Sequence, residues 1–224
     1  MNKIKFIIIF LCSALLFSFQ ASATSNIYYK HCDGEMKIAL TFDDGPHPKK
    51  TPQILEVLRE YGVRATFFEI GENIRYYPQI AKMVLSEGHE IGNHTYSHPH
   101  INKINKSDIC QELYDCDEVM KDILNYTPNL FRPPEGIVDD EIRAIAQDMN
   151  YNVILWSVDT KDWSGRSADD IVNDVEKSVK PGDIILMHDY TSRNCHTVEA
   201  LRRIIPRLLS KGYTFVTVSE LINK

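Results

Sequence analysis

Two adjacent carboxylates, Asp43 and Asp44, follow a strand-like apolar run in the segment ALTFDDGPHP. Like charges this close are costly in a half-buried site unless a cation lies between them. Farther along, GNHTYSH places His94 and His98 four residues apart, a spacing that puts both imidazoles on one face of a helical turn. Two histidines and an aspartate can hold a catalytic metal ion with positions left for water and substrate. We therefore predict a metal site made by Asp44, His94 and His98, with Asp43 as a base.

Strand-like apolar runs alternate with helical patterns along the rest of the chain. The expected strands are Lys37–Phe42, Ala65–Ile70, His89–Gly92, Asn129–Phe131, Asn152–Ser157, Asp183–Met187 and Tyr213–Val218. The expected helices are Thr51–Tyr61, Tyr77–Glu87, Lys106–Asn125, Asp139–Met149, Ala168–Val179, Thr197–Lys211 and Ser219–Ile222. This alternation predicts an α/β fold with a parallel sheet, a barrel of about seven strands that is smaller than the eight-stranded one.

The polar clusters occur where expected strands end. They are Asp43–Asp44, His94 with His98, Arg132, Asp159 with Asp162 and Trp163, and His188. The carboxyl ends of parallel barrel strands converge on one face, where active sites form. Sequence order therefore predicts a single site assembled from five segments.

Five motifs in order, TFDDGP, HTYSH, RPPEG, DTKDW and LMH, resemble those of the polysaccharide deacetylase family, the NodB-homology domains of carbohydrate esterase family 4. The resemblance spans about Lys37 to Leu221. It implies a distorted (β/α) barrel and the metal-dependent removal of N-acetyl, or sometimes O-acetyl, groups from a glycan.

The resemblance also implies a role for each matching residue. Asp43 would be the general base, oriented by Arg132. His188 would be the general acid, supported by Asp162 together with Arg64. Asp44, His94 and His98 would be ligands of one divalent ion, usually Zn²⁺, with Co²⁺ or another ion as alternatives. Trp163 would line the groove, and Leu186 would line a pocket for the acetyl methyl group.

Glu135 departs from the family pattern, which commonly has tyrosine after the two prolines. The backbone N–H at this position helps to bind the oxyanion in the family. Pro133 and Pro134 have no N–H, so the N–H of Glu135 is the first donor after Arg132 and can keep that role. The side chain, however, puts a carboxylate where the family has an aromatic ring.

The first 23 residues resemble a secretory signal, with a basic MNKIK, a short apolar run and the small-residue segment ASA. We expect three segments: a signal peptide at 1–23, a lead-in at 24–35 and the catalytic domain at 36–224. An uncleaved anchor is the alternative. The mature protein would be a secreted or cell-wall-associated monomer without stable membrane insertion. The net charge is −6 for the whole chain and −8 once Lys3 and Lys5 are removed with the signal, so the protein has no electrostatic reason to bind nucleic acid.

Four cysteines, Cys32, Cys110, Cys116 and Cys195, follow the predicted signal. Export permits disulfides, but buried or free thiols explain the cysteines as well. Cys110 and Cys116 fall on opposite sides of one expected helix and cannot pair there. The spacing matches no zinc-ligand pattern.

The expected function is a secreted hydrolase that deacetylates N-acetylglucosamine units of a cell-wall glycan, with peptidoglycan first. Chitooligosaccharides and N-acetylmuramic acid units are the alternative substrates. Two other classes fit less well. A non-haem iron oxygenase would use the two histidines and one carboxylate, but Asp43 and His188 suit hydrolysis better. A glycan-binding module that has lost catalysis is disfavoured because the ligands, the base and the acid are all retained.

Overall fold

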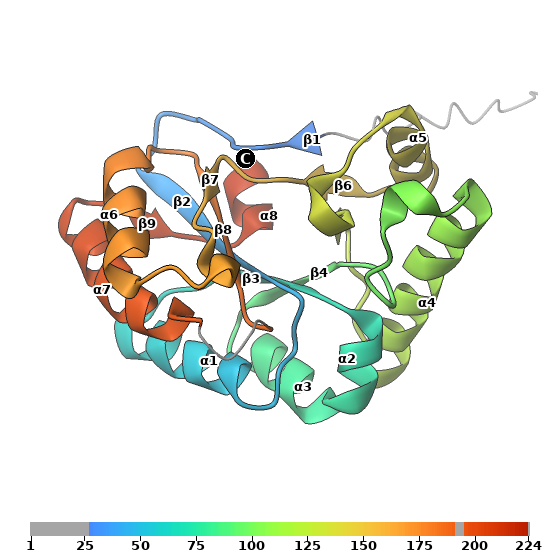
Figure 1. Cartoon of the computed structure of the whole chain (residues 1–224), viewed down its shortest axis with the longest axis horizontal. Helices are drawn as coiled ribbons and strands as arrows, with labels where there is room; N and C mark the ends of the chain where they lie inside the picture. The colour runs from blue at the N-terminus through green and yellow to red at the C-terminus, as the bar shows by residue number, and fades with distance from the viewer. Residues whose placement is uncertain (1–26, 191–194, 224) are drawn as a thin grey trace, which may run out of the picture.

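The structure, a computed structural model, describes residues 27–190 and 195–223 (Figure 1). The predicted signal peptide and residues 24–26 of the lead-in lie outside the described residues. The boundaries proposed for them stay predictions.

The described residues form one nine-stranded sheet in which every strand pair is parallel. The strands are β1 (Ile27–Tyr28), β2 (Lys37–Asp43), β3 (Thr66–Glu69), β4 (Glu90–Asn93), β5 (Leu130–Phe131), β6 (Asn152–Ile154), β7 (Val158–Asp159), β8 (Ile184–His188) and β9 (Thr214–Phe215). Their order is β1-β6-β5-β4-β3-β2-β8-β7, with β9 paired to β2. The predicted distorted α/β barrel is therefore confirmed, with its sheet path ending at β1 and β7.

Among the α-helices of the described residues, all but the last cover the outside of the curved sheet, and the last packs on its inner face (Figure 1). They are α1 (Lys50–Tyr61), α2 (Gly71–Tyr76), α3 (Pro78–Ser86), α4 (Lys106–Leu124), α5 (Asp140–Asp148), α6 (Ala168–Ser178), α7 (Thr197–Ser210) and α8 (Val218–Ile222), with 3₁₀ turns η1 (Ile101–Lys103), η2 (Pro134–Gly136) and η3 (Asp162–Ser164). None of the described helices is long and apolar enough to span a membrane.

Alternation along β2 explains how the sheet holds a polar site above an apolar core. Ile38, Leu40 and Phe42 pack in the cluster between the sheet and the outer helices. Successive strand residues point to opposite faces, so Ala39, Thr41 and Asp43 share the inner face. Ala39 belongs to the inner apolar cluster, which includes Val218, Leu221 and Ile222 of α8. The inner face therefore changes from apolar to polar toward the carboxyl end of β2.

The same alternation operates on β8, the neighbour of β2. Ile185 and Met187 pack outward in the main core, whereas Ile184 joins the inner cluster. His188 pairs in register with Asp43. Two strands that are adjacent in the sheet but far apart in sequence thus deliver a carboxylate and an imidazole to the same edge.

Several expected elements differ from the observed ones. The strand expected over Asn152–Ser157 ends at Ile154, and β7 starts separately at Val158, because the chain turns between β6 and β7 to join the far side of the sheet. Sequence patterns also missed the two-residue β1 and the short helix α2, since neither is long enough to show a period.

The helical turn expected for His94 and His98 is wrong. Both residues lie in the loop after β4. Thr95 and His98 have φ angles of 68° and 54°, which belong to the left-handed region and cannot continue a right-handed helix. The two rings still meet, with centroids 5.0 Å apart.

The four cysteines of the described chain are all free, so no disulfide joins them. Cys110 and Cys116 share α4, as expected. Cys116 is fully buried and packs as an apolar residue in the main core.

Candidate metal centre and active site

A cavity of about 530 Å³ opens at the carboxyl ends of the strands. Its lining contains most of the residues singled out from the sequence: Asp43, Asp44, His94, His98, Glu135, Trp163, Leu186 and His188, together with Trp156, Asp159 and Tyr190. The five sequence segments therefore meet at one place, as predicted.

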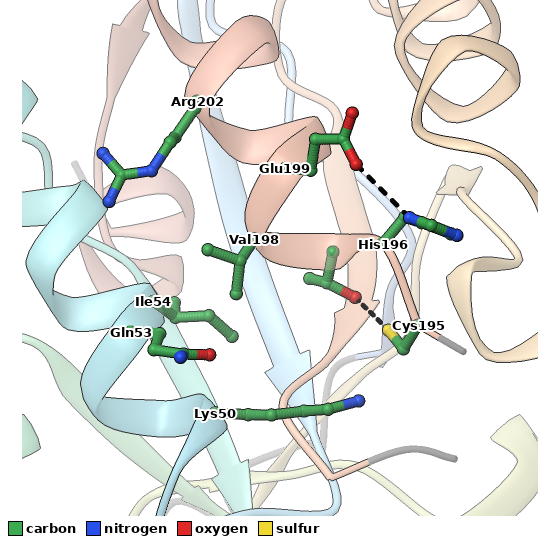
Figure 2. A pocket seen from close by; sticks show the side chains of 9 residues that line it. Lys50, Gln53, Ile54, Cys195, His196, Val198, Glu199 and Arg202 are labelled. Atoms are coloured by element: carbon green, nitrogen blue, oxygen red, sulfur yellow. Dashed lines mark hydrogen bonds and ion pairs between the residues drawn. The ribbon is translucent and has the colours of Figure 1, made fainter. Parts of the chain in front are cut away.

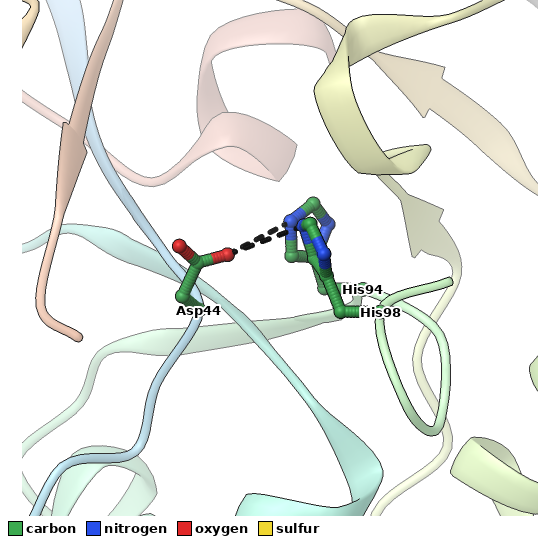
Figure 3. A group of neighbouring side chains, drawn as sticks. All are labelled: Asp44, His94 and His98. Atoms are coloured by element: carbon green, nitrogen blue, oxygen red, sulfur yellow. Dashed lines mark ion pairs between the residues drawn. The ribbon is translucent and has the colours of Figure 1, made fainter. Parts of the chain in front are cut away.

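Asp44, His94 and His98 point their polar atoms at one another, as Figure 3 shows. Oδ1 of Asp44 lies 3.5 Å from Nε2 of His94 and 3.4 Å from Nε2 of His98. Ligand atoms about 2.0–2.1 Å from one tetrahedral metal are about 3.3–3.4 Å from each other. The donor set and its spacing therefore fit a metal such as zinc, held by two imidazoles and one carboxylate.

His94 is oriented for ligation by its backbone neighbour. Nδ1 of His94 lies 2.7 Å from the carbonyl oxygen of Arg132. A carbonyl can only accept, so Nδ1 carries the proton and Nε2 keeps a free lone pair. A hydrogen bond of this kind fixes the tautomer and the ring orientation of metal-binding histidines.

The charges of the three residues are coupled. Burial raises the pKa of Asp44, but the hydrogen bond and charge of His94 outweigh it and hold this pKa below its ordinary value. Burial lowers the pKa of His94, but Asp43 and Asp44 reverse that effect and leave it raised. Burial, followed by repulsion from His94, lowers the pKa of His98. A metal binds the neutral imidazoles and the carboxylate, so metal binding competes with protonation of His94.

Asp43 has a different partner from its neighbour Asp44. Nη1 of Arg132 donates to Oδ1 of Asp43 at 2.6 Å and to the hydroxyl of Thr41 at 2.8 Å. Arg132 is fully buried, and its other nitrogens donate to the carbonyl oxygens of Ile154 and Leu155, each at 3.1 Å. The guanidinium therefore has fixed partners and offsets the charge of one member of the carboxylate pair.

His188 is held by a carboxylate that is buried completely. Nδ1 of His188 lies 2.8 Å from Oδ1 of Asp162, and the backbone N–H of His188 donates to Oδ2 at 2.9 Å. Burial lowers the pKa of His188, but the hydrogen bond and charge of Asp162 raise it to about 9. The imidazolium is thus stabilised at neutral pH, as a general acid requires.

The sequence did not point to Thr197, which completes this arrangement. Its hydroxyl donates to Oδ2 of Asp162 at 2.5 Å from the first turn of α7. Thr197 is 1% exposed. A threonine at a helix start is normally a capping residue, so nothing in the sequence separates this threonine from the others.

The expected substrate residues are at the cavity wall. Leu186 is buried and lines the cavity, while Trp163 is 55% exposed. Glu135 stands in η2 with a φ of 59°, and its carboxylate meets Nδ1 of His100 at 3.0 Å. The role of its backbone N–H toward an oxyanion stays a prediction.

Arg64 is not part of the site, contrary to its expected role beside Asp162. It forms an ion pair with Glu220 at 2.6 Å, and its side chain is half exposed. Arg64 precedes β3, whereas the site lies at the carboxyl ends of the strands, so sequence proximity to a strand was misleading.

Two buried carboxyl groups, Glu69 and Asp189, lie behind the site. Burial, and then the charge of Asp189, raises the pKa of Glu69 well above its ordinary value. Burial likewise raises the pKa of Asp189 to about 7. Asp189 accepts from Thr51, and its carboxylate fills the space that a Cβ on Gly45 would need. Glycine at position 45 is therefore required for Asp189 to pack against the loop that carries Asp44.

A second hollow of about 380 Å³ lies between α1 and α7 (Figure 2). Its lining is Lys50, Gln53, Ile54, Cys195, His196, Thr197, Val198, Glu199 and Arg202. Of these lining residues, Thr197 also forms a hydrogen bond with Asp162. No residue predicted from the sequence to act in the site lines this hollow.

Comparison with known proteins gives the same family as the motifs. Residues 30–154 match the family described as polysaccharide deacetylase. The chain is 41% identical over 201 residues to a peptidoglycan-N-acetylglucosamine deacetylase of Bacillus cereus, covering 89% of this chain and 94% of the relative. It is 40% identical over 184 residues to a peptidoglycan-N-acetylmuramic acid deacetylase of Bacillus subtilis, covering 82% of this chain and 38% of that longer protein.

Solved structures support the same grouping. A crystal structure of a peptidoglycan N-acetylglucosamine deacetylase superposes with a TM-score of 0.85 at 39% identity. The match covers 87% of this chain and 92% of the other. Fold and sequence thus agree along nearly the whole described chain.

Proposed function

Because the chain belongs to the polysaccharide deacetylase family, we propose that it is a metal-dependent hydrolase that removes the acetyl group from N-acetylglucosamine units of peptidoglycan. One observation supports this proposal above the others. A three-residue metal site, an arginine-paired carboxylate and a carboxylate-paired histidine all line one cavity.

Amide hydrolysis needs an activated water, stabilisation of the negative oxygen and a proton for the departing nitrogen. A metal held by Asp44, His94 and His98 would polarise the carbonyl and activate the water when bound. Asp43 accepts the proton of the attacking water, with Arg132 fixing the position of its carboxylate. His188 donates a proton to the amide nitrogen as the C–N bond breaks. The products are acetate and a free amine on the sugar.

Zinc suits this donor set, since borderline-soft Zn²⁺ binds imidazole and carboxylate together in tetrahedral sites. Cobalt prefers similar ligands and could replace it. The metal proposal is tested by chelation: exhaustive metal removal should abolish acetate release, and added Zn²⁺ or Co²⁺ should restore it. Full activity without metal would contradict the metal-dependent mechanism.

The central experiment incubates residues 24–224 with purified peptidoglycan and with fully acetylated chitooligosaccharides. Released acetate is measured, and mass spectrometry identifies the sugar that lost an acetyl group. Deacetylated glucosamine in peptidoglycan is the expected result. Two outcomes would contradict the proposed substrate: loss of acetyl groups from N-acetylmuramic acid alone, or no loss of acetyl groups from either peptidoglycan or the chitooligosaccharides.

We also propose that the protein acts outside the membrane after cleavage at Ala23, since the first residues have the pattern of an export signal. Expression in a Gram-positive host, followed by fractionation and N-terminal sequencing, tests this. Protein that begins at Thr24 in the medium or cell wall is expected. A chain that keeps residue 1 in the cytoplasm would contradict the localisation.

A further inference from the structure

The carboxylates around the cavity fall into two groups. Asp43 is neutralised by Arg132, and Asp44 faces the two metal-binding histidines. Glu135 and Asp159 line the same cavity. The described residues that line it include no lysine or arginine. The wall of the cavity therefore carries negative charge that the catalytic arrangement does not use.

Glu135 is placed at this wall by a tightly packed turn. Glu135 follows the buried Pro134 in the short η2 turn. The next residue, Gly136, packs so closely against the ring of Trp156 that a Cβ would not fit. The ring of His100 contacts Oε1 of Glu135 at 3.0 Å. Its side chain is 45% exposed, so the carboxylate can still face a ligand in the cavity.

Asp159 approaches the cavity from another strand. It ends β7 and pairs in register with Leu186 on β8, the residue expected beside the acetyl methyl group. Its Oδ1 accepts from the backbone N–H of Lys161 at 2.9 Å, which orients the carboxylate in the turn that follows β7. A sugar bound among these residues thus meets one carboxylate from η2 and one from the end of β7.

We propose that Glu135 and Asp159 make the cavity select its reacting sugar by charge: it accepts neutral N-acetylglucosamine and rejects a unit with a free carboxylate, such as N-acetylmuramic acid. This inference rests on the proposed deacetylase function and adds to it the residues that select between the two sugars that the relatives' names contain. Like charges repel in the cavity, and the substrate carboxylate would find no described lysine or arginine there to pair with.

The size of the effect follows from exposure. Pairwise interactions between solvent-exposed charges amount to about 0.2–1 kcal/mol, so each carboxylate should discriminate by about 1.5- to 5-fold. The discrimination should shrink as salt rises from about 0.01 M to about 1 M, because the screening length falls from about 30 Å to about 3 Å.

The test compares two matched tetrasaccharides, the fully acetylated chitotetraose and a strand alternating N-acetylglucosamine with N-acetylmuramic acid whose lactyl carboxylates are free. For the wild-type holoenzyme, kcat/KM should be higher for the neutral strand, and the acetyl groups lost from the mixed strand should come from glucosamine. Glu135→Gln and Asp159→Asn should each reduce the ratio by about 1.5- to 5-fold, and Glu135→Lys should reduce it more.

The matched control is Glu141→Gln, which makes the same charge change on the exposed surface of α5, outside the cavity lining. It should leave the ratio unchanged. A ratio that is the same in wild type, Glu135→Gln and Asp159→Asn, or one that does not respond to salt, overturns the inference.

Binding separates this inference from the proposed function. Quenching of tryptophan fluorescence from Trp156 and Trp163 gives the affinity of each strand without turnover. Acetate release from both strands at equal rates would leave the deacetylase function standing and reject selection by charge. Tighter binding of the neutral strand without any acetate release would support the selection and reject the function. Equal affinities together with equal rates would reject the inference alone.

Discussion

The floor and the rim of the cavity are built in opposite ways. The floor is made by Asp43, His94, Arg132 and Asp162. These residues are at most 4% exposed, and each has a specific polar partner. The rim, which we define as His100, Glu135, Trp163 and Tyr190, is exposed by 41% or more at Trp163 and Tyr190. Buried polar groups without partners are costly, so the floor is fixed as a unit, whereas rim residues can change singly.

This contrast separates chemistry from choice of substrate. A change in the floor leaves another buried polar group unpaired and alters the reacting geometry. A change at the rim alters contacts with the bound sugar and leaves the floor intact. The predictions below rank these effects from the largest to the smallest.

Removing a metal ligand should have the largest effect. His94→Ala or His98→Ala should abolish activity together with metal binding, since losing even an outer-sphere partner costs about 10- to 100-fold in metal affinity. Metal content and acetate release are measured on the same sample. The control is His196→Ala, at the start of α7 and outside the cavity. Full zinc content in His94→Ala would show that the ligand assignment is wrong.

Asp43→Asn should separate the base from the ligands. The amide keeps the shape of the carboxylate but cannot accept a proton, so kcat should fall by about 10²–10⁴ while metal stays bound. Asp44→Ala should lose metal as His94→Ala does. If Asp43→Asn loses its metal as completely, Asp43 is itself a ligand, and the division of roles between the two aspartates fails.

Asp162→Asn should move the alkaline limb of the pH–rate profile. The pKa of His188 is raised to about 9, so the protonated acid persists through neutral pH and is lost as pH rises through that value. Asp162 is the main group raising it, so the variant should lose activity at lower pH. Bound metal would lower the alkaline limb of the wild type and that of Asp162→Asn together. The alkaline limb of the variant should therefore still lie at lower pH than that of the wild type.

The control for this comparison is Asp148→Asn, an exposed carboxylate at the end of α5. It should reproduce the wild-type profile. An alkaline limb that stays in place in Asp162→Asn would mean that another group supplies the proton.

Trp163→Ala should have the smallest effect and should act on binding. Loss of an aromatic contact worth about 0.5–1.5 kcal/mol should raise KM by about 2- to 12-fold and leave kcat nearly unchanged. Tyr114→Ala, at a tyrosine exposed to nearly the same degree on α4, is the matched control. A fall in kcat as large as that of Asp43→Asn would erase the distinction between rim and floor.

Much of the floor could be predicted from the sequence because its residues are short motifs at strand ends. Asp43 and Asp44 are adjacent, His94 and His98 are four residues apart, and His188 ends an apolar run. A parallel α/β fold brings such ends together whatever the length of the helices between them. The predicted meeting of these residues therefore holds even where the expected local structure is wrong, as in the loop that carries His94 and His98.

The sequence by itself determined the parallel α/β class, the ordered motifs and the residues of the candidate metal site. Only the tertiary structure decided which neighbours complete them. Thr197 reaches Asp162, Thr41 reaches Arg132, and His100 reaches Glu135. The residues of the first two pairs are 35 and 91 positions apart. Such pairs depend on strand order and register, which long-range packing sets and no local period encodes.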